Sequence, residues 1–250
     1  MKPRHWFTPT SLVYILAHVV LFLIGFALAK GANALLQGIG VSLIAASITG
    51  WVIFVYLRLS ERRSESLEIL TRFGFVTAFE ARAARIKPEY DQRLAKASEH
   101  IDIMGFGLKA LWEDYHSQFE DWKARAHVRI LLIDPHSAYG DQRDVEESEI
   151  EGSIRGSVKR FLRETAVLRS NIGKTRFEIR LYTCLPSVNI FRVDDEMFWG
   201  PYLIRAQSRN APTFIVRRGG VLYGSLLSHF ETIWKDDTLS RPITPADTED

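Results

Sequence analysis

Residues 187–203, SVNIFRVDDEMFWGPYL, decide the fold because they predict a β-hairpin. Two runs rich in β-branched and aromatic residues flank the pair Asp194 and Asp195, and acidic residues favour a tight turn. Ser187 and Asn189 begin the first of these runs with polar side chains. The rest of the chain must indicate whether this is a working site, an inactive one or a hairpin of the core.

Strand and helix patterns alternate on both sides of the hairpin. The expected strands are residues 101–106 (IDIMGF), 128–134 (VRILLID), 177–184 (FEIRLYTC) and 213–218 (TFIVRR). The second of these is almost continuously apolar, as a strand covered on both faces is. Helices are expected between the strands and after residue 218, up to Lys235. This order predicts an α/β sandwich, a mixed sheet with flanking helices, over residues 89–235.

The strand order resembles the phospholipase D superfamily, in a single half-length copy over roughly residues 95–235. The resemblance is carried by IDIMGFGLKAL, VRILLIDP, FEIRLYTCLPSVNIFRVDDEMFWGPYL, FIVRRGG and HFETIWK. In that family the hairpin carries H-x-K-x-x-x-x-D, where the histidine is the nucleophile and the lysine binds phosphate. Aligned on Asp194, the histidine position is Ser187 and the lysine position is Asn189, while Gly200 lies close to the family's glycine.

These departures predict a protein that is not an enzyme. Ser187 has no base nearby in sequence to activate it, and Asn189 can hydrogen-bond a phosphate without neutralising its charge. His136, in the loop after Asp134, is a histidine that could substitute in space. A cleft of this ancestry still suits phosphate groups. The single cysteine, Cys184, excludes a disulfide framework and a cysteine metal site, and no cofactor is expected.

Basic residues near the hairpin suggest a phosphate-rich ligand. Arg155, Lys159 and Arg163 recur every four residues on one expected helix face, and arginines combined with aromatic residues are typical of a single-stranded nucleic-acid groove. Glu147 and Glu151 upstream leave open the alternative of solvated helix ion pairs. The candidate ligand-binding residues are His136, Arg155, Lys159, Arg163, Ser187, Asn189, Arg192, Trp199, Arg205, Arg209 and Asn210.

Two uncharged apolar runs, residues 11–29 and 34–57, precede this domain. Each is long enough to cross a bilayer core of about 30 Å, and residues 30–33 are a short turn, so residues 1–58 predict a two-helix transmembrane hairpin. Lys2 and Arg4 fall on the same side as Arg58, Arg62 and Arg63, with only Lys30 opposite. This asymmetry predicts a multi-pass protein with both termini in the cytoplasm.

The second run carries small residues every four positions, at Gly38, Ser42, Ala46 and Gly50. Such rows let helices approach closely in lipid. The row either packs the second helix on the first or joins copies of the chain into an oligomer. His18, in the middle of the first run, is a functional candidate because it is ionisable, or a neutral residue bonded to the neighbouring helix.

Charge is distributed unevenly along the chain. Residues 1–60 hold four basic residues and no acid, whereas residues 236–250 hold five acids and one arginine. The body between them is nearly neutral, so a nucleic-acid site would have to be a local cluster. A charged helix with an apolar stripe through Leu67, Leu70, Phe73 and Phe79 predicts a stalk over residues 59–88, ended by Pro88. Residues 236–250 predict an acidic flexible tail.

The whole layout resembles the membrane effectors of bacterial anti-phage defence, most of all the Hailong-type systems. That resemblance implies residence in the bacterial inner membrane and a homo-oligomeric, pore-like assembly, such as a dimer of dimers. It also implies a single-stranded oligonucleotide ligand, DNA by preference, made by a partner nucleotidyltransferase. The alternatives are a membrane-tethered phosphodiesterase, either a phospholipase or a nuclease, and a purely structural scaffold.

Overall fold

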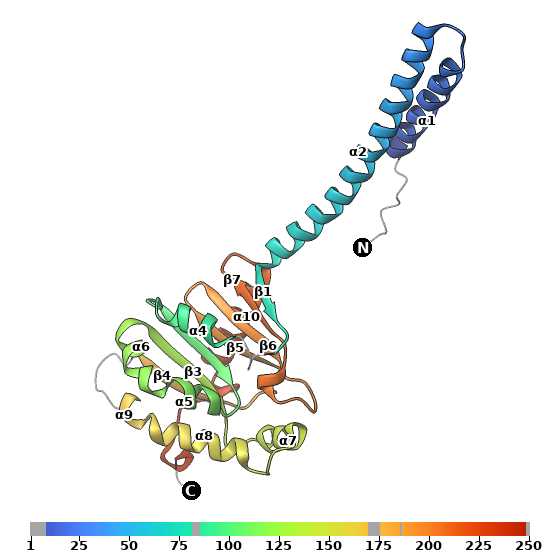
Figure 1. Cartoon of the computed structure of the whole chain (residues 1–250). Coiled ribbons are helices and arrows are strands. Elements are labelled where there is room, and N and C mark those ends of the chain that lie inside the picture. Colours follow the sequence, from blue (N-terminus) through green and yellow to red (C-terminus); the bar gives the residue numbers. More distant parts are fainter. Residues whose placement is uncertain (1–8, 82–85, 170–175, 186, 249–250) are drawn as a thin grey trace. The chain divides into compact units, whose positions relative to one another are not determined.

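The computed structural model describes residues 9–81, 86–169, 176–185 and 187–248, apart from the side chains of residues 9–10 and 61–65. By its internal contacts the chain forms two units, Met1–Ile69 and Leu70–Asp250, which are described separately (Figure 1). Lys2, Arg4 and the side chains of Arg62 and Arg63 lie outside the described residues. The predicted orientation in the membrane therefore remains a prediction.

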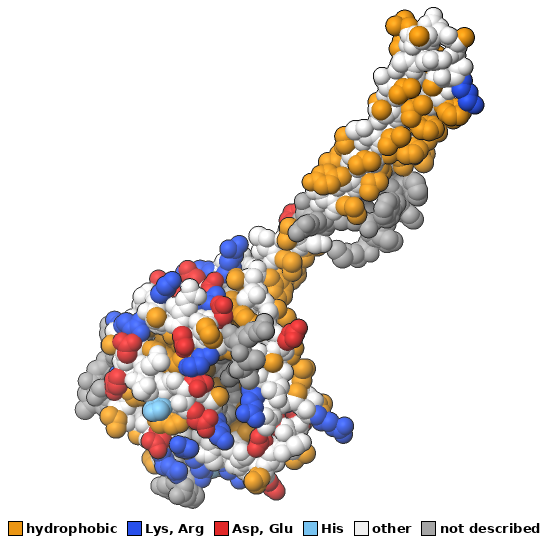
Figure 2. Space-filling model, in the orientation of Figure 1, with side chains coloured by type: hydrophobic (Ala, Val, Ile, Leu, Met, Phe, Trp, Pro, Cys, Tyr) orange, Lys and Arg blue, Asp and Glu red, His pale blue; other side chains and the backbone are white. Residues whose placement is uncertain are grey.

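The first unit contains α1 (Pro9–Ala29) and most of α2 (Ala34–Phe73). Two stretches, Ser11–Ala29 and Ala34–Ser60, are long enough and apolar enough to cross a membrane. Many hydrophobic side chains of this helix pair are exposed, and they are seen along the face shown in Figure 2. Helices that are apolar all round and mostly exposed would need a nonpolar solvent or a partner.

Small residues bring α1 and α2 together. A Cβ at Gly25 would lie 2.8 Å from the carbonyl oxygen of Gly40, so the two backbones are nearly in contact. The Tyr14 hydroxyl donates to the Gly50 carbonyl over 3.1 Å. His18 stacks on Tyr14 with ring centroids 4.1 Å apart, and its Nδ1 lies 2.9 Å from the Tyr14 carbonyl oxygen. His18 therefore contacts its own helix and Gly50. A Cβ at residue 50 would clash with the His18 ring, so glycine is required at this position.

The predicted row of small residues divides between two faces of α2. Gly50 is buried against α1, whereas Gly38, Ser42 and Ala46 are exposed. A repeat of four residues drifts around a helix of 3.6 residues per turn, which explains why the row does not stay on one face. The interpretation that the whole row packs α2 against α1 is therefore wrong for three of its four members.

The second unit is a mixed eight-stranded sheet with flanking helices, which confirms the predicted fold class. The strands are β1 (Phe75–Phe79), β2 (His100–Gly105), β3 (His127–Ile133), β4 (Phe177–Tyr182), β5 (Val188–Val193), β6 (Glu196–Pro201), β7 (Thr213–Arg217) and β8 (Ser240–Arg241). Their order is β1-β7-β6-β5-β2-β3-β4-β8, in which β2, β3 and β4 are parallel and the remaining pairs are antiparallel.

Helices cover both faces of the sheet. They are α4 (Lys87–Leu94), α5 (Lys109–Tyr115), α6 (Phe119–Arg125), α7 (Ala138–Glu147), α8 (Ser153–Glu164), α9 (Ala166–Arg169) and α10 (Val221–Lys235), with the 3-10 turns η1 (His116–Gln118), η2 (Ser208–Asn210) and η3 (Pro245–Asp247). Aromatic contacts such as Phe119–Phe177 at 5.7 Å place α6 on one face. The contact of Arg129 with Glu231 places α10 on the other face.

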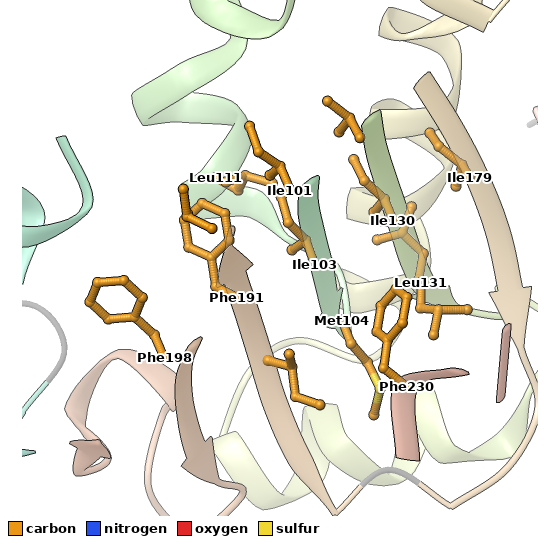
Figure 3. Close-up of a cluster of buried hydrophobic side chains, with 14 of the residues drawn as sticks. Ile101, Ile103, Met104, Leu111, Ile130, Leu131, Ile179, Phe191, Phe198 and Phe230 are labelled. Carbon is orange, nitrogen blue, oxygen red and sulfur yellow. The ribbon is translucent and has the colours of Figure 1, made fainter. Parts of the chain in front are cut away.

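The core lies between these layers (Figure 3). Ile101, Val128 and Ile130 are fully buried, as expected for central parallel strands. Side chains alternate between the two faces of each strand, so Phe191 points with Ile101 and Ile103 towards α4 and α6. Ile190 and Arg192 point towards α10. This alternation decides the surroundings of each residue in the hairpin.

The predicted stalk ends earlier than the sequence indicates. Helix α2 stops at Phe73 because Gly74 takes a positive φ of 80°, and residues 75–79 form β1, which pairs with β7. A Cβ at Gly74 would lie 2.8 Å from the Gly220 Cα, so the close approach and the backbone angle both require glycine here. Phe79 therefore belongs to the sheet and not to a helical stripe.

The predicted flexible tail is also different in the structure. Residues 240–241 form β8 against β4, and residues 245–247 form a 3-10 turn. Asp247 is fully buried and accepts hydrogen bonds from the backbone nitrogen and hydroxyl of Thr244 at 2.7 and 2.8 Å. Asp247, one of the acids that led to the prediction of a flexible tail, is thus buried and hydrogen-bonded to Thr244. Residues 249–250 lie outside the described residues.

Candidate ligand-binding site

The hairpin formed by β5 and β6 holds the two positions aligned with the family's catalytic pair. Ser187 is exposed, just before β5. Asn189 is only 7% exposed, and its Nδ2 donates to the Gly200 carbonyl oxygen across the hairpin over 2.9 Å. The side chain predicted to meet a phosphate therefore ties β5 to β6.

Asp194 performs the turn function expected from the sequence. It has a φ of 49°, and its carboxylate accepts hydrogen bonds from the backbone nitrogens of Ser98, Glu99 and His100 at 3.0, 2.9 and 2.8 Å. Burial opposes ionisation of this carboxyl, but the backbone hydrogen bonds outweigh burial and lower its pKa. Asp194 thus joins the hairpin to the beginning of β2.

Arg192 lies in the core, where a ligand cannot reach it. It is 4% exposed, and its Nη1 lies 2.7 Å from Asp102 Oδ2, while its Nε donates to the Asp194 carbonyl over 2.9 Å. The prediction that Arg192 binds a ligand is therefore wrong, because its position in β5 points it towards α10. Trp199, in β6, stacks on Phe214 at 5.0 Å and also packs within the domain.

A buried arginine, Arg143, packs against the loop that follows β6. Arg143, in α7, is 2% exposed and donates to the carbonyl oxygens of Leu203 and Ala206, each over 2.9 Å. Its guanidinium also lies 5.9 Å from the ring centroid of Phe106 and 5.2 Å from that of Tyr202. Ion pairs with Glu146 and Glu147 complete its contacts. The sequence drew no attention to Arg143, because Phe106, Tyr202, Leu203 and Ala206 are all distant from it along the chain.

The loop after β6 carries three predicted ligand residues. Arg205, Arg209 and Asn210 are all exposed on this segment, and Arg209 Nε donates to Gln207 Oε1 over 2.8 Å. The backbone nitrogen of Arg205, which has a φ of 59°, donates to the Glu146 carbonyl oxygen over 3.0 Å. The structure thus keeps these three residues together, beside α7.

The predicted basic face of α8 is partly engaged. Arg155 forms an ion pair with Asp141 of α7 at 2.8 Å, which agrees with the alternative of helix ion pairs but with a different acid. Lys159 and Arg163 lie further along α8, and each has a partner of its own. The face is therefore not a row of free cations.

His136 lies in a cluster with Asp134 and Asp247, in which potential ligand atoms lie within 4.8 Å of one another. Arg241 already pairs with both carboxylates, with its Nε 2.6 Å from Asp134 Oδ2 and its Nη2 2.6 Å from Asp247 Oδ1. Burial opposes the charged form of Asp247, but the hydrogen bonds from Arg241 and Thr244 lower its pKa strongly. The guanidinium supplies the positive charge that a metal ion would, so the cluster fixes the C-terminal segment in place.

A cavity of about 260 Å³ lies between the β2–α5 loop and α8. It is lined by Gly107, Lys109, Trp112, Glu113, Ser153, Gly156, Ser157, Arg160 and Phe161. The cavity begins two residues after the carboxyl end of a parallel strand, where open α/β sheets commonly bind ligands. The sequence signal that could have found it is GFGLK, residues 105–109, in which a glycine ends a buried strand and a second glycine and a lysine follow it.

The solved structures to which the chain is similar include the following two. One is TrmBL2, an archaeal chromatin protein described as showing a novel mode of DNA binding, with 13% identity and a TM-score of 0.47 over 80% of this chain and 70% of that one. The other is phosphatidylserine synthase of Haemophilus influenzae Rd KW20, of the phospholipase D superfamily, with 9% identity and a TM-score of 0.44 over 66% of this chain and 39% of that one. Neither likeness is close enough to transfer a function. No curated protein matches this sequence.

One family profile matches residues 72–238, about two thirds of the chain. The match begins beside Gly74, where α2 gives way to the sheet, and it includes every strand from β1 to β7. The chain therefore belongs to the family described as Domain of unknown function (DUF5919).

Proposed function

We propose that this protein is a homo-oligomeric membrane effector of anti-phage defence, in which a catalytically inactive α/β domain binds an oligonucleotide that controls a toxic activity of the membrane helices. The ligand is a single-stranded oligonucleotide, DNA by preference, supplied by a partner nucleotidyltransferase. Both termini lie in the cytoplasm, and the helices span the inner membrane.

The hairpin is the observation that carries the proposal. A phosphodiesterase of the phospholipase D type needs a nitrogen nucleophile and a cation for the phosphate, and here an exposed serine and a buried, hydrogen-bonded asparagine hold those positions. Arg143, which contacts the loop after β6, does not replace the missing cation, because it is buried and already pairs with Glu146 and Glu147. Binding without turnover is the function that this arrangement favours over the alternative of a membrane-tethered phosphodiesterase.

Assembly is supported by the exposed part of the small-residue row. Gly38, Ser42 and Ala46 lie on a face of α2 that does not contact α1 within the described residues. Small side chains on a lipid-facing surface let a second helix pack closely, because packing and not hydrophobicity drives helix association in a bilayer. This face is where we expect copies of the chain to meet.

The proposal is tested by purifying the full-length protein in detergent from cells that carry its neighbouring genes. We expect a co-purifying oligonucleotide and binding of short single-stranded DNA that weakens steeply with salt, because neutralised phosphates release counterions. The variant Arg205→Glu/Arg209→Glu should weaken binding if the loop after β6 contributes to the site. Lys96→Glu is the matched control, because Lys96 is exposed near the start of β2, at the opposite end of that strand from the β2–α5 loop.

Two results would overturn the proposal. The first is the absence of both co-purifying nucleic acid and salt-sensitive binding to short DNA or RNA. The second is turnover of phosphatidyl substrates, single-stranded DNA or RNA that Ser187→Ala or His136→Ala abolishes, which would establish the phosphodiesterase instead.

A further inference from the structure

We propose that the cavity between the β2–α5 loop and α8 binds a phosphate group of a nucleotide, with Lys109 and Arg160 as its charge partners. This assignment rests on the function proposed above, since it gives that ligand a specific site. It differs from the sequence-based expectation, which placed the ligand at the hairpin and on the arginines around it.

Lys109 and Arg160 are exposed cations that line the same cavity from two helices. Among the described residues, neither side chain has an ion pair or a hydrogen bond. A second, more open cavity of about 470 Å³ differs in this respect. There Lys87 lies 3.6 Å from Asp91, and Arg125 contacts Asp121 at 2.5 Å as well as three backbone carbonyl groups. Of these two cavities, the smaller one thus offers a ligand two cations that form no ion pair among the described residues.

Glycines shape this cavity on two sides. A Cβ at Gly107 would lie 2.9 Å from the Ser157 Cβ, so the β2–α5 loop packs directly onto α8 because residue 107 has no side chain. A Cβ at Gly156 would meet nothing within 4 Å, so the absence of a side chain there leaves open space. Gly107 thus lets the loop and α8 meet at one side of the cavity, and Gly156 leaves the space at the other side unfilled.

The remaining lining suits a nucleotide better than a bare phosphate. Trp112 is held by edge contacts with Phe119 and Phe161, each at 5.9 Å, and by stacking with His116 at 5.0 Å. A base could stack on the part of this fixed indole that those rings leave uncovered. Glu113 repels an anion but can accept a hydrogen bond from a sugar hydroxyl or a base amino group. A volume of about 260 Å³ is small for a whole oligonucleotide and suits one nucleotide unit.

The test compares substitutions in and away from the cavity in the full-length protein. The probe is a fluorescein-labelled single-stranded tetranucleotide, as DNA and as RNA, with binding followed by anisotropy. Gly156→Leu fills the cavity without changing charge, and its matched control is Gly224→Leu in α10. That control is also helical, with nothing within 4 Å of an added Cβ, and it lies on the opposite face of the sheet. Arg160→Glu and Lys109→Glu reverse the charges, with Lys96→Glu as their control.

We expect Gly156→Leu, Arg160→Glu and Lys109→Glu each to raise Kd by at least about tenfold, as for loss of a charge-assisted contact. The controls should stay within about twofold of the parent. Thermal unfolding of Gly156→Leu should be no earlier than that of the parent, because leucine favours a helix more than glycine. Weak binding can then be assigned to the cavity and not to misfolding.

The outcomes separate this assignment from the proposed function. If the tetranucleotide binds and only Arg205→Glu/Arg209→Glu weakens it, the cavity is not the site and the proposed function stands. If no tetranucleotide binds but ADP binds in a manner that Gly156→Leu abolishes, the cavity assignment stands and the proposed function fails. If only vesicles containing phosphatidylglycerol bind through the cavity, its phosphate belongs to a lipid and the nucleotide assignment is overturned.

Discussion

Arg192 and Asp102 form an ion pair inside the sheet, with 2.7 Å between Nη1 and Oδ2, although ninety residues separate them in the sequence. They are 4% and 1% exposed. Asp102 also binds Arg129 through two hydrogen bonds of 2.7 and 3.0 Å, and Arg129 reaches Glu231 of α10 at 2.6 Å. Two carboxylates thus balance two guanidinium groups, which offsets the cost of burying the charges.

Removal of the Arg192 charge should destabilise the fold. Arg192→Met keeps much of the volume but leaves Asp102 with one buried partner, and we expect a loss of about 3 kcal/mol in the free energy of unfolding. Urea unfolding of the full-length protein in detergent, followed by tryptophan fluorescence, measures it. The exposed Arg209→Met should change stability by less than about 0.5 kcal/mol. Equal stabilities of the two variants would mean that the buried pair contributes nothing net.

The same cluster should make stability depend on pH. Burial opposes ionisation of Glu231, but hydrogen bonds from Arg129 and Lys235 lower its pKa to about 2, from an ordinary value of 4.5. Since the pKa is lower in the folded state, the stabilisation is complete above pH 4.5 and is lost as the pH falls towards 2. We expect Glu231→Gln to reduce the slope of stability against pH in this window, by on the order of 2 kcal/mol in total. Exposed Glu120→Gln is the control, and an unchanged slope in Glu231→Gln would contradict the prediction.

Substitutions by leucine at two small residues of α2, Gly50 and Ala46, should have different effects. Gly50→Leu places a side chain against His18 and should separate α1 from α2. Ala46→Leu adds bulk on the exposed face and should lower the oligomer mass in detergent while the helix pair stays intact. The contact between α1 and α2 is measured by crosslinking of cysteines that replace Phe22 and Trp51. The ring centroids of these two residues lie 6.4 Å apart in the structure. An unchanged mass for Ala46→Leu would assign the oligomer contact to another face.

The C-terminal segment should open when its buried acid is removed. Asp247→Ala leaves Arg241 without two of its charged contacts and Thr244 without its acceptor, and we expect a loss of about 2 kcal/mol. Hydrogen exchange should show faster exchange of the Thr183 amide, which donates to the Leu239 carbonyl over 2.9 Å. Asp237→Ala is the control, because Asp237 is 87% exposed although it pairs with Arg180. Equal protection in both variants would show that the segment is held without Asp247.

Features that depend on neighbouring residues were predictable from the sequence. The two apolar runs, the buried strands and the turn at Asp194 each depend on the composition of one short stretch, and the structure has them where they were expected. The mixed sheet followed from the order of these elements. The end of α2 at Gly74 was missed because a charged helical pattern continues past it, and only the approach of Gly220 reveals why glycine is required.

The candidate site depended on tertiary structure. Arg192 and Arg205 look alike as arginines near one hairpin, but alternation along β5 turns Arg192 into the core, while Arg205 stays on an exposed loop. Lys109 and Arg160 are separated by fifty-one residues, and their meeting at one cavity requires α5 to pack on α8. The sequence by itself determined the elements and their order, because hydrophobic periodicity is local. Which charges are buried in pairs and which remain available to a ligand was decided by packing between distant elements, because only the folded chain brings their partners together.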